Sequence, residues 1–159
     1  MIVPEESIRE VLSLYKPEQR ILQSANIDYP KIEGHFLIGK TYYTLSPFEH
    51  ATDIEIQLCL NQLAYVGISE TIKLSLDPLF KGIDFKNLQK EGMYIIESRK
   101  RFKRQINPNK EIEGSILIKE KINKMGIIFC YADFQFENKS CFGNLELAVI
   151  NKVSNGETK

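Results

Sequence analysis

Three polar side chains recur at a spacing of four residues within an apolar stretch of the sequence. They are Gln57, Asn61 and Tyr65. On a helix, residues four positions apart lie above one another, so the three side chains would form one narrow polar strip. Amide and phenol groups donate and accept hydrogen bonds, so this strip could orient a carbonyl group or an attacking water or amine.

The same residues also have a structural interpretation. An unpaired amide inside an apolar helix costs about 1–3 kcal/mol, so Asn61 and its neighbour Gln62 are expected to have partners. Backbone groups of a neighbouring strand or subunit would serve. The residues alone slightly favour this structural role, and we assign it to Gln62.

The helix that would carry the strip is predicted over residues 53–74. Thr52 and Glu55 have the spacing of a capping box, in which each binds backbone groups of the first turn. This role accounts for Glu55, and we leave it out of catalysis. The helix is apolar on most sides, which predicts burial nearly all round. Its amino end would present N–H groups and the positive end of the helix dipole to a ligand.

Five cations occur within six residues at positions 99–104. On a strand, Arg99, Arg101 and Lys103 would point to one side, and Lys100 and Arg104 to the other. Such a run could bind phosphate groups or an acidic protein surface, which is the interpretation that we favour. The alternative is a solvated edge strand whose charges prevent aggregation.

Metal and thiol chemistry have little support in the sequence. With two histidines and no Cys-x-x-Cys pair, we predict no metal site. His50 precedes the long helix and has the pKa range of a general base, although a lone loop histidine is more often only solvated. Cys59, Cys130 and Cys141 lie in apolar stretches, and we predict that they are reduced core residues.

The remaining elements follow from periodicity and turn residues. A first helix is predicted over residues 4–15, with Tyr15 closing its apolar face. Strands are predicted over residues 20–29, 31–45, 93–106, 111–122, 126–138 and 141–152, with a loop over 77–92. The strand 126–138 is apolar on both faces at its centre, which predicts an interior strand covered on both sides.

This order of elements predicts an α+β protein of one domain over residues 1–153, followed by a disordered tail over 154–159. One long apolar helix held by a curved antiparallel sheet is the hot-dog arrangement. Lys and Arg equal Asp and Glu at 21 each, which gives no general attraction to nucleic acid or an anionic membrane. We see no secretory signal and no membrane-spanning run, and expect a cytoplasmic location.

Three motifs carry a resemblance to a known family. Residues 50–65, which include Leu-Cys-Leu-Asn-Gln-Leu-Ala-Tyr at 58–65, closely resemble the helix signature of the FcoT-like type III fatty-acyl thioesterases. Residues 101–108 resemble the family's Arg-Phe…Asn-Pro strand end, and residues 143–151 its Gly-x-x-Glu-Leu-Ala-x-x-Asn strand. The resemblance extends in order from about residue 5 to residue 151.

The resemblance implies a hot-dog enzyme, dimeric or assembled from dimers, that hydrolyses the thioester of an acyl-CoA or acyl-carrier protein. CoA or phosphopantetheine would be part of the substrate, with no separate cofactor. Some members instead add glycine across the double bond of a 2-enoyl-carrier protein in isonitrile lipopeptide pathways, which is the first alternative. A non-catalytic acyl-thioester binder is the second. A dehydratase is less favoured, because its helix usually pairs a histidine with an acid where this chain offers Asn61.

Site residues follow from matching the family's positions. Tyr15, Tyr43 and Asn61 correspond to proposed site residues, and the resemblance turns the balance for Asn61 towards function. Thr52 stands where the family usually has asparagine; both are good helix caps. We expect the helix amino end and the Tyr43 hydroxyl to polarise the thioester carbonyl, and His50 to act as the base.

We expect the part of the substrate that carries phosphate to bind along the cationic strand and the Asn-Pro motif after it. The residues that we assign to this role are Arg99, Arg101, Lys103 and Asn107.

Overall fold

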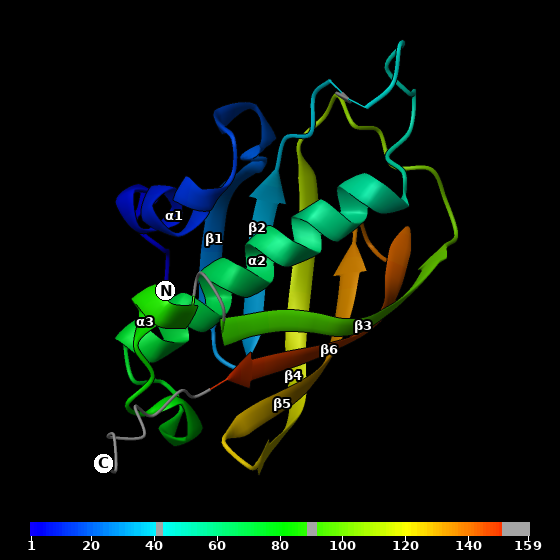
Figure 1. Cartoon of the computed structure of the whole chain (residues 1–159). Helices are drawn as coiled ribbons and strands as arrows, with labels where there is room; N and C mark the ends of the chain where they lie inside the picture. The colour runs from blue at the N-terminus through cyan, green and yellow to red at the C-terminus, as the bar shows by residue number, and fades with distance from the viewer. Residues whose placement is uncertain (41–42, 89–91, 151–159) are drawn as a thin grey trace.

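In the computed structural model, which describes residues 1–40, 43–88 and 92–150, one long helix lies against a curved antiparallel sheet (Figure 1). The helices are α1 (Glu5–Val11), α2 (Asp53–Lys73) and α3 (Phe85–Asn87), with 3₁₀ turns at Leu12–Leu14, Pro17–Gln19 and Pro78–Phe80. The strands are β1 (Leu22–Asp28), β2 (Lys31–Phe36), β3 (Met93–Phe102), β4 (Ile112–Lys124), β5 (Ile127–Phe136) and β6 (Cys141–Ile150). Their order in the sheet is β1-β2-β4-β5-β6-β3. The predicted α+β arrangement is confirmed.

Two strands are shorter than predicted, for the same reason. β2 ends at Phe36, which pairs with Ile112, the first residue of β4. β3 ends at Phe102, which pairs with Cys141, the first residue of β6. A strand continues only where a neighbour offers a hydrogen-bonding ladder. Tyr43 therefore lies in the loop that leads to α2 and not on a strand.

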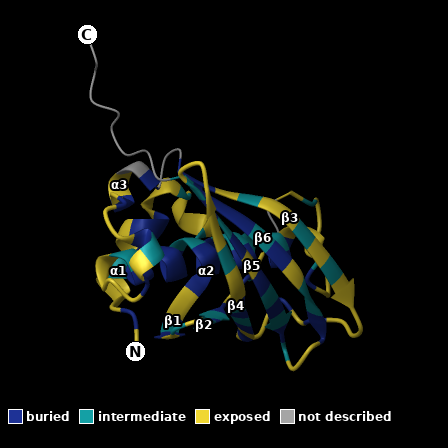
Figure 2. Cartoon of the chain, turned by 90° about the horizontal axis from the view of Figure 1, so that it is seen from below, coloured by how far each residue is buried: buried dark blue, intermediate teal, exposed yellow. Residues whose placement is uncertain are grey.

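The prediction that residues 126–138 are covered on both sides is wrong. β5 is interior in the sheet, between β4 and β6. However, its buried residues, such as Cys130 and Phe134, alternate with more accessible ones, such as Tyr131 (Figure 2). The outward face of β5 is apolar only in its first half, at Ile127, Phe129 and Tyr131, and it is not covered within this chain.

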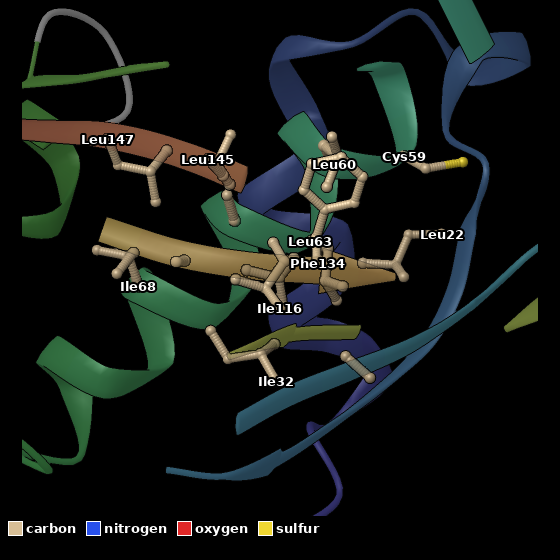
Figure 3. Packing of buried hydrophobic residues seen from close by; sticks show 14 of the residues in the cluster. Leu22, Ile32, Cys59, Leu60, Leu63, Ile68, Ile116, Phe134, Leu145 and Leu147 are labelled. Carbon is tan, nitrogen blue, oxygen red and sulfur yellow. The ribbon is translucent and has the colours of Figure 1, made fainter. Parts of the chain in front are cut away.

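The core lies between α2 and the inner face of the sheet. Figure 3 shows Leu63 and Ile68 of α2 beside Ile116, Phe134 and Leu147 of three strands, and all five are buried. Burial of these side chains drives the docking of the helix.

The three cysteines are unpaired and buried, as predicted; they are Cys59, Cys130 and Cys141. No helix in the described part of the chain is long and apolar enough to cross a membrane.

Between Glu55 and Thr71, the prediction that α2 is buried nearly all round holds for all but one strip, whereas both ends of the helix are more exposed. Gln57, Leu58, Asn61 and Tyr65 are only half-buried. Gln62, next to Asn61, is fully buried. Its Oε1 accepts hydrogen bonds of 3.0 Å from the backbone N–H groups of Ile21 and Leu22, and its Nε2 donates one of 2.6 Å to the Gln19 carbonyl.

These three bonds fix the chain before β1 against the helix. The structural role assigned to Gln62 is confirmed.

A second polar cluster fixes the far end of α2. The Asp77 carboxylate forms an ion pair with Lys121 of β4. It also accepts a hydrogen bond of 2.5 Å from the Tyr29 hydroxyl and one of 2.9 Å from the Leu79 N–H group. Lys121 also donates to the Tyr29 hydroxyl at 2.7 Å. Burial raises the pKa of Asp77, but the bonds from Lys121 and Tyr29 outweigh burial and bring it below its ordinary value.

Replacing Gln62 by leucine is expected to lower the free energy of unfolding by about 3 kcal/mol, because buried backbone groups lose their partners. The matched control is Asn61→Leu at the adjacent, half-buried position, where we expect a change below about 1 kcal/mol. Urea denaturation of both variants measures the difference. Equal losses would contradict the structural role of Gln62.

Asp77→Asn is expected to cost about 3 kcal/mol at neutral pH, because Lys121 is left partly buried without its anion. The folded pKa of Asp77 lies below the unfolded value of about 3.9. Its contribution is therefore present above that pH and lost as pH falls through the folded pKa, so the difference between wild type and variant should shrink in acid. The control is Asp133→Asn, whose 3.4 Å pair with Lys119 is half exposed and should contribute less than about 1 kcal/mol. Denaturation curves across pH test both statements.

Candidate active site

The predicted polar strip of α2 lines an open cavity of about 460 Å³ whose other wall is β3. Gln57, Asn61 and Tyr65 form the helix wall, and Met93–Ser98 form the strand wall. The Gln57 Nε2 group donates 3.0 Å to the Asn61 Oδ1 atom. The Tyr65 hydroxyl donates 3.3 Å to the Met93 carbonyl. The four-residue spacing therefore predicted a real face of the helix.

A β-bulge decides which side chains of β3 meet that face. Ile95 pairs with Leu147 and Glu97 with Glu146, so Ile96 is an extra residue in β3. An extra residue shifts the alternation of side chains by one position.

The consequence appears in the contacts after the bulge. Ser98 donates 2.7 Å to the Gln57 Oε1 atom, and Lys100 pairs at 3.1 Å with Asp53 at the start of α2. Without the bulge, Glu97 and Arg99 would face the helix.

The Asn61 amide is the polar group best placed to meet a ligand. Its Oδ1 atom already accepts from Gln57. Its N–H groups have no hydrogen-bond partner among residues 1–40, 43–88 and 92–150, and the residue is half-buried on the cavity wall. Within the described part of the chain, the Asn61 N–H donors are therefore available to a molecule in the cavity, whereas its Oδ1 atom already has one partner.

Tyr15 does not line this cavity, although it lies close enough to Tyr65 to interact with it electrostatically. It follows the 3₁₀ turn after α1 and is half-buried against the core. Burial, and then the neighbouring Tyr65, raise the pKa of Tyr15 to about 12. Its phenol therefore stays protonated at neutral pH and can act only as a neutral hydrogen-bonding group.

Tyr43 and Thr52 meet at the amino end of α2. Their hydroxyl oxygens lie 2.9 Å apart, and the Tyr43 hydroxyl also donates to the buried Glu55 carboxylate. The Thr52 N–H group donates a hydrogen bond of 2.7 Å to the Glu55 carboxylate. The Ile54 N–H group donates one of 3.3 Å to the Thr52 hydroxyl. The capping box is thus confirmed.

This network corrects one expectation. The Tyr43 hydroxyl and the Ile54 N–H group were expected to be free to polarise a carbonyl, but both donate within the protein. Burial raises the pKa of Glu55, and the bonds from Thr52 and Tyr43 bring it below its ordinary value, which keeps Glu55 an anion and an acceptor. No hydrogen bond or ion pair in the described part of the chain joins Tyr43 to Asn61.

His50 belongs to a different cavity. It stacks on Phe48, with ring centroids 5.9 Å apart, and lines a space of about 510 Å³ together with Thr52, Lys103 and Arg104. The structure therefore does not bring His50 to Asn61.

The cationic residues do not gather in one place. Arg99 is exposed and pairs with Glu97, Lys103 lies 5.1 Å from the centre of the Phe142 ring, and Arg101 is also exposed. The Asn107 Oδ1 atom accepts 2.9 Å from the Asn109 N–H group and so closes a turn. Only Lys103 of the four predicted phosphate-binding residues lines the cavity beside His50.

Sequence reasoning missed Ser98 and Lys100 as neighbours of the polar strip. The bulge at Ile96 turns these side chains towards α2, and the residue types around it do not predict a bulge. In the described part of the chain, no group of three or more His, Cys, Asp or Glu residues could hold a metal ion.

Sequence comparison relates this chain to one family of enzymes. The model of the FcoT-like thioesterase domain matches residues 10–149. A (2E)-enoyl-[ACP] glycyltransferase of Mycobacterium marinum is 29% identical over 126 residues, which cover 74% of this chain and 68% of that protein. The Mycobacterium tuberculosis protein of the same name is 28% identical over 137 residues, covering 80% and 74%.

Solved structures share the fold. A mutant thioesterase from Pseudomonas aeruginosa aligns with a TM-score of 0.57 and 12% identity over 93% of this chain and 94% of that one. A putative thioesterase, described as a phenylacetic acid degradation-related protein, from Ralstonia eutropha aligns with a TM-score of 0.52 and 10% identity over 90% and 98%. The long helix, the curved six-stranded sheet and the family match together make this chain an enzyme of the FcoT-like thioesterase family, with the hot-dog fold that its sequence predicted.

Proposed function

We propose that this enzyme binds a fatty 2-enoyl thioester carried by an acyl-carrier protein and adds glycine to its double bond. The observation that carries the proposal is the Asn61 amide, which presents N–H donors to the cavity between α2 and β3. The relatives named as (2E)-enoyl-[ACP] glycyltransferases support the choice of substrate and nucleophile.

In this reaction, negative charge develops on the carbonyl oxygen of the thioester. The glycine nitrogen forms a bond to C3 of the enoyl group, and the electrons of the C2–C3 double bond move towards the thioester oxygen. A proton then joins C2, the nitrogen loses a proton, and the thioester itself remains. A donor that is in place before the reaction stabilises the charge on that oxygen. In our proposal, Asn61 is this donor, while Tyr65 forms part of the polar wall of the cavity.

Hydrolysis of the thioester is the second candidate, and the description of the matching family model favours it. Attack by water at the carbonyl carbon sends negative charge to the same oxygen, so Asn61 would serve both reactions. Hydrolysis also needs a base for the water. Glu55 is committed to the capping box, and Glu97 on the cavity wall pairs with Arg99.

Other parts of the proposal come from the sequence and from the resemblance. They are the use of CoA in place of the carrier protein, binding of phosphate near Lys103, a homodimer or assembly of dimers, a cytoplasmic location and a place in isonitrile lipopeptide biosynthesis. Each remains a prediction.

Incubation with a 2-enoyl-carrier protein and glycine tests the reaction, with mass spectrometry of the carrier protein as the measurement. Gain of one glycine supports addition, loss of the acyl group supports hydrolysis, and an unchanged carrier protein refutes both.

Asn61→Asp removes the N–H donor with little change in shape and should lower turnover about 100-fold. Asn123→Asp, at an exposed position on β4, is the matched control and should leave turnover unchanged.

A further inference from the structure

Lys100 is a buried lysine on a strand whose other cations are exposed. Its side chain is 8% exposed, whereas that of Arg99 is 80% exposed. The Lys100 Nζ group donates 2.8 Å to the Ser98 hydroxyl and pairs at 3.1 Å with the Asp53 carboxylate. A lysine is rarely buried without a specific partner, and here the partners lead to the cavity.

Lys100 begins a chain of hydrogen bonds that has one direction. An ammonium group can only donate, so the Ser98 oxygen accepts from it. The Ser98 hydroxyl in turn donates a hydrogen bond of 2.7 Å to the Gln57 Oε1 atom. This sets the orientation of the Gln57 amide, whose Nε2 group donates to the Asn61 Oδ1 atom at 3.0 Å. The remaining groups at the end of the chain are the Asn61 N–H donors.

We propose that Lys100, Ser98 and Gln57 are positioning residues that fix which end of the Asn61 amide faces the cavity. We call these three residues the orienting relay. The assignment of Asn61 to the thioester oxygen rests on the proposed function, whereas the direction of the relay rests on the hydrogen bonds alone.

The relay matters because the two ends of an amide have nearly the same shape and opposite electrostatics. A carboxamide that rotates by half a turn would present its oxygen to a developing oxyanion, which is repulsive. Nothing in the shape of the cavity distinguishes the two orientations, but a buried cation at the start of the chain does. The bulge at Ile96 is what brings that cation to the helix side of β3.

Gln57→Glu tests the relay by reversing its direction. A carboxylate can only accept, so it would accept from both Ser98 and Asn61 and would turn the Asn61 oxygen towards the cavity. We expect turnover to fall about 100-fold with little change in KM, because the lost contact acts mainly in the transition state. Gln23→Glu, an exposed glutamine on β1 outside the relay, is the matched control and should retain wild-type turnover.

Conservative pairs separate orientation from stability. Lys100→Arg and Ser98→Thr keep a hydrogen-bond donor at each position, so they preserve the direction of the relay and should retain most of the activity. Lys100→Met and Ser98→Ala remove that donor and should lose the activity. Urea denaturation should show that all four variants fold. Loss of activity in both members of a pair, or in neither, would overturn the relay.

A nuclear magnetic resonance measurement makes the relay testable without turnover. The side-chain N–H signals of Asn61 should exchange rapidly with water in the wild type and more slowly in Gln57→Glu, where they gain an internal acceptor. If this change occurs but the wild type converts no thioester, the relay stands and the proposed function falls. If the wild type is active and Gln57→Glu changes only the turnover, only the exchange of the Asn61 signals, or neither of them, the relay is wrong.

Discussion

The rotation of α2 about its own axis is the constraint on which the candidate site depends. Gln62 is held by three buried hydrogen bonds to the chain before β1. Adjacent residues of a helix point about 100° apart, so fixing Gln62 also fixes Asn61 towards β3. The apolar core supplies the adhesion of the helix to the sheet, but apolar contacts tolerate small rotations. The directional bonds of Gln62 do not.

The polar groups of the helix fall into two sets with different duties. At the amino end, Thr52, Glu55 and Tyr43 satisfy one another and leave little for a ligand. Two turns further along, Asn61 has one side of its amide satisfied and the other directed at a cavity. A closed network and an open one therefore occupy the same helix, and the open one is where a substrate can gain binding energy.

Most of the architecture could be predicted from the sequence because it depends on local patterns. The Thr52–Glu55 spacing located the start of α2, and the spacing of Gln57, Asn61 and Tyr65 predicted their shared face. Strand ends were less predictable, because Phe36 stops β2 only where β4 begins to pair with it. The prediction that the cations form one binding surface failed for a related reason. A strand pattern predicts that side chains alternate, but it does not predict which side meets the helix. The bulge at Ile96 also changes that alternation midway along β3.

The extra residue in β3 also has a consequence for how this enzyme can vary. Among the strands that the structure describes, β3 is at the edge of the sheet and pairs only with β6, so a one-residue irregularity disturbs a single ladder. Before the bulge, Met93 packs into the core; after it, Ser98 and Lys100 serve the cavity. The side-chain alternation in the two halves of the strand is thus shifted by one residue. The polar half that faces the start of α2 can therefore vary separately from the half that packs into the core, so the side chains beside the cavity can change while the fold is kept.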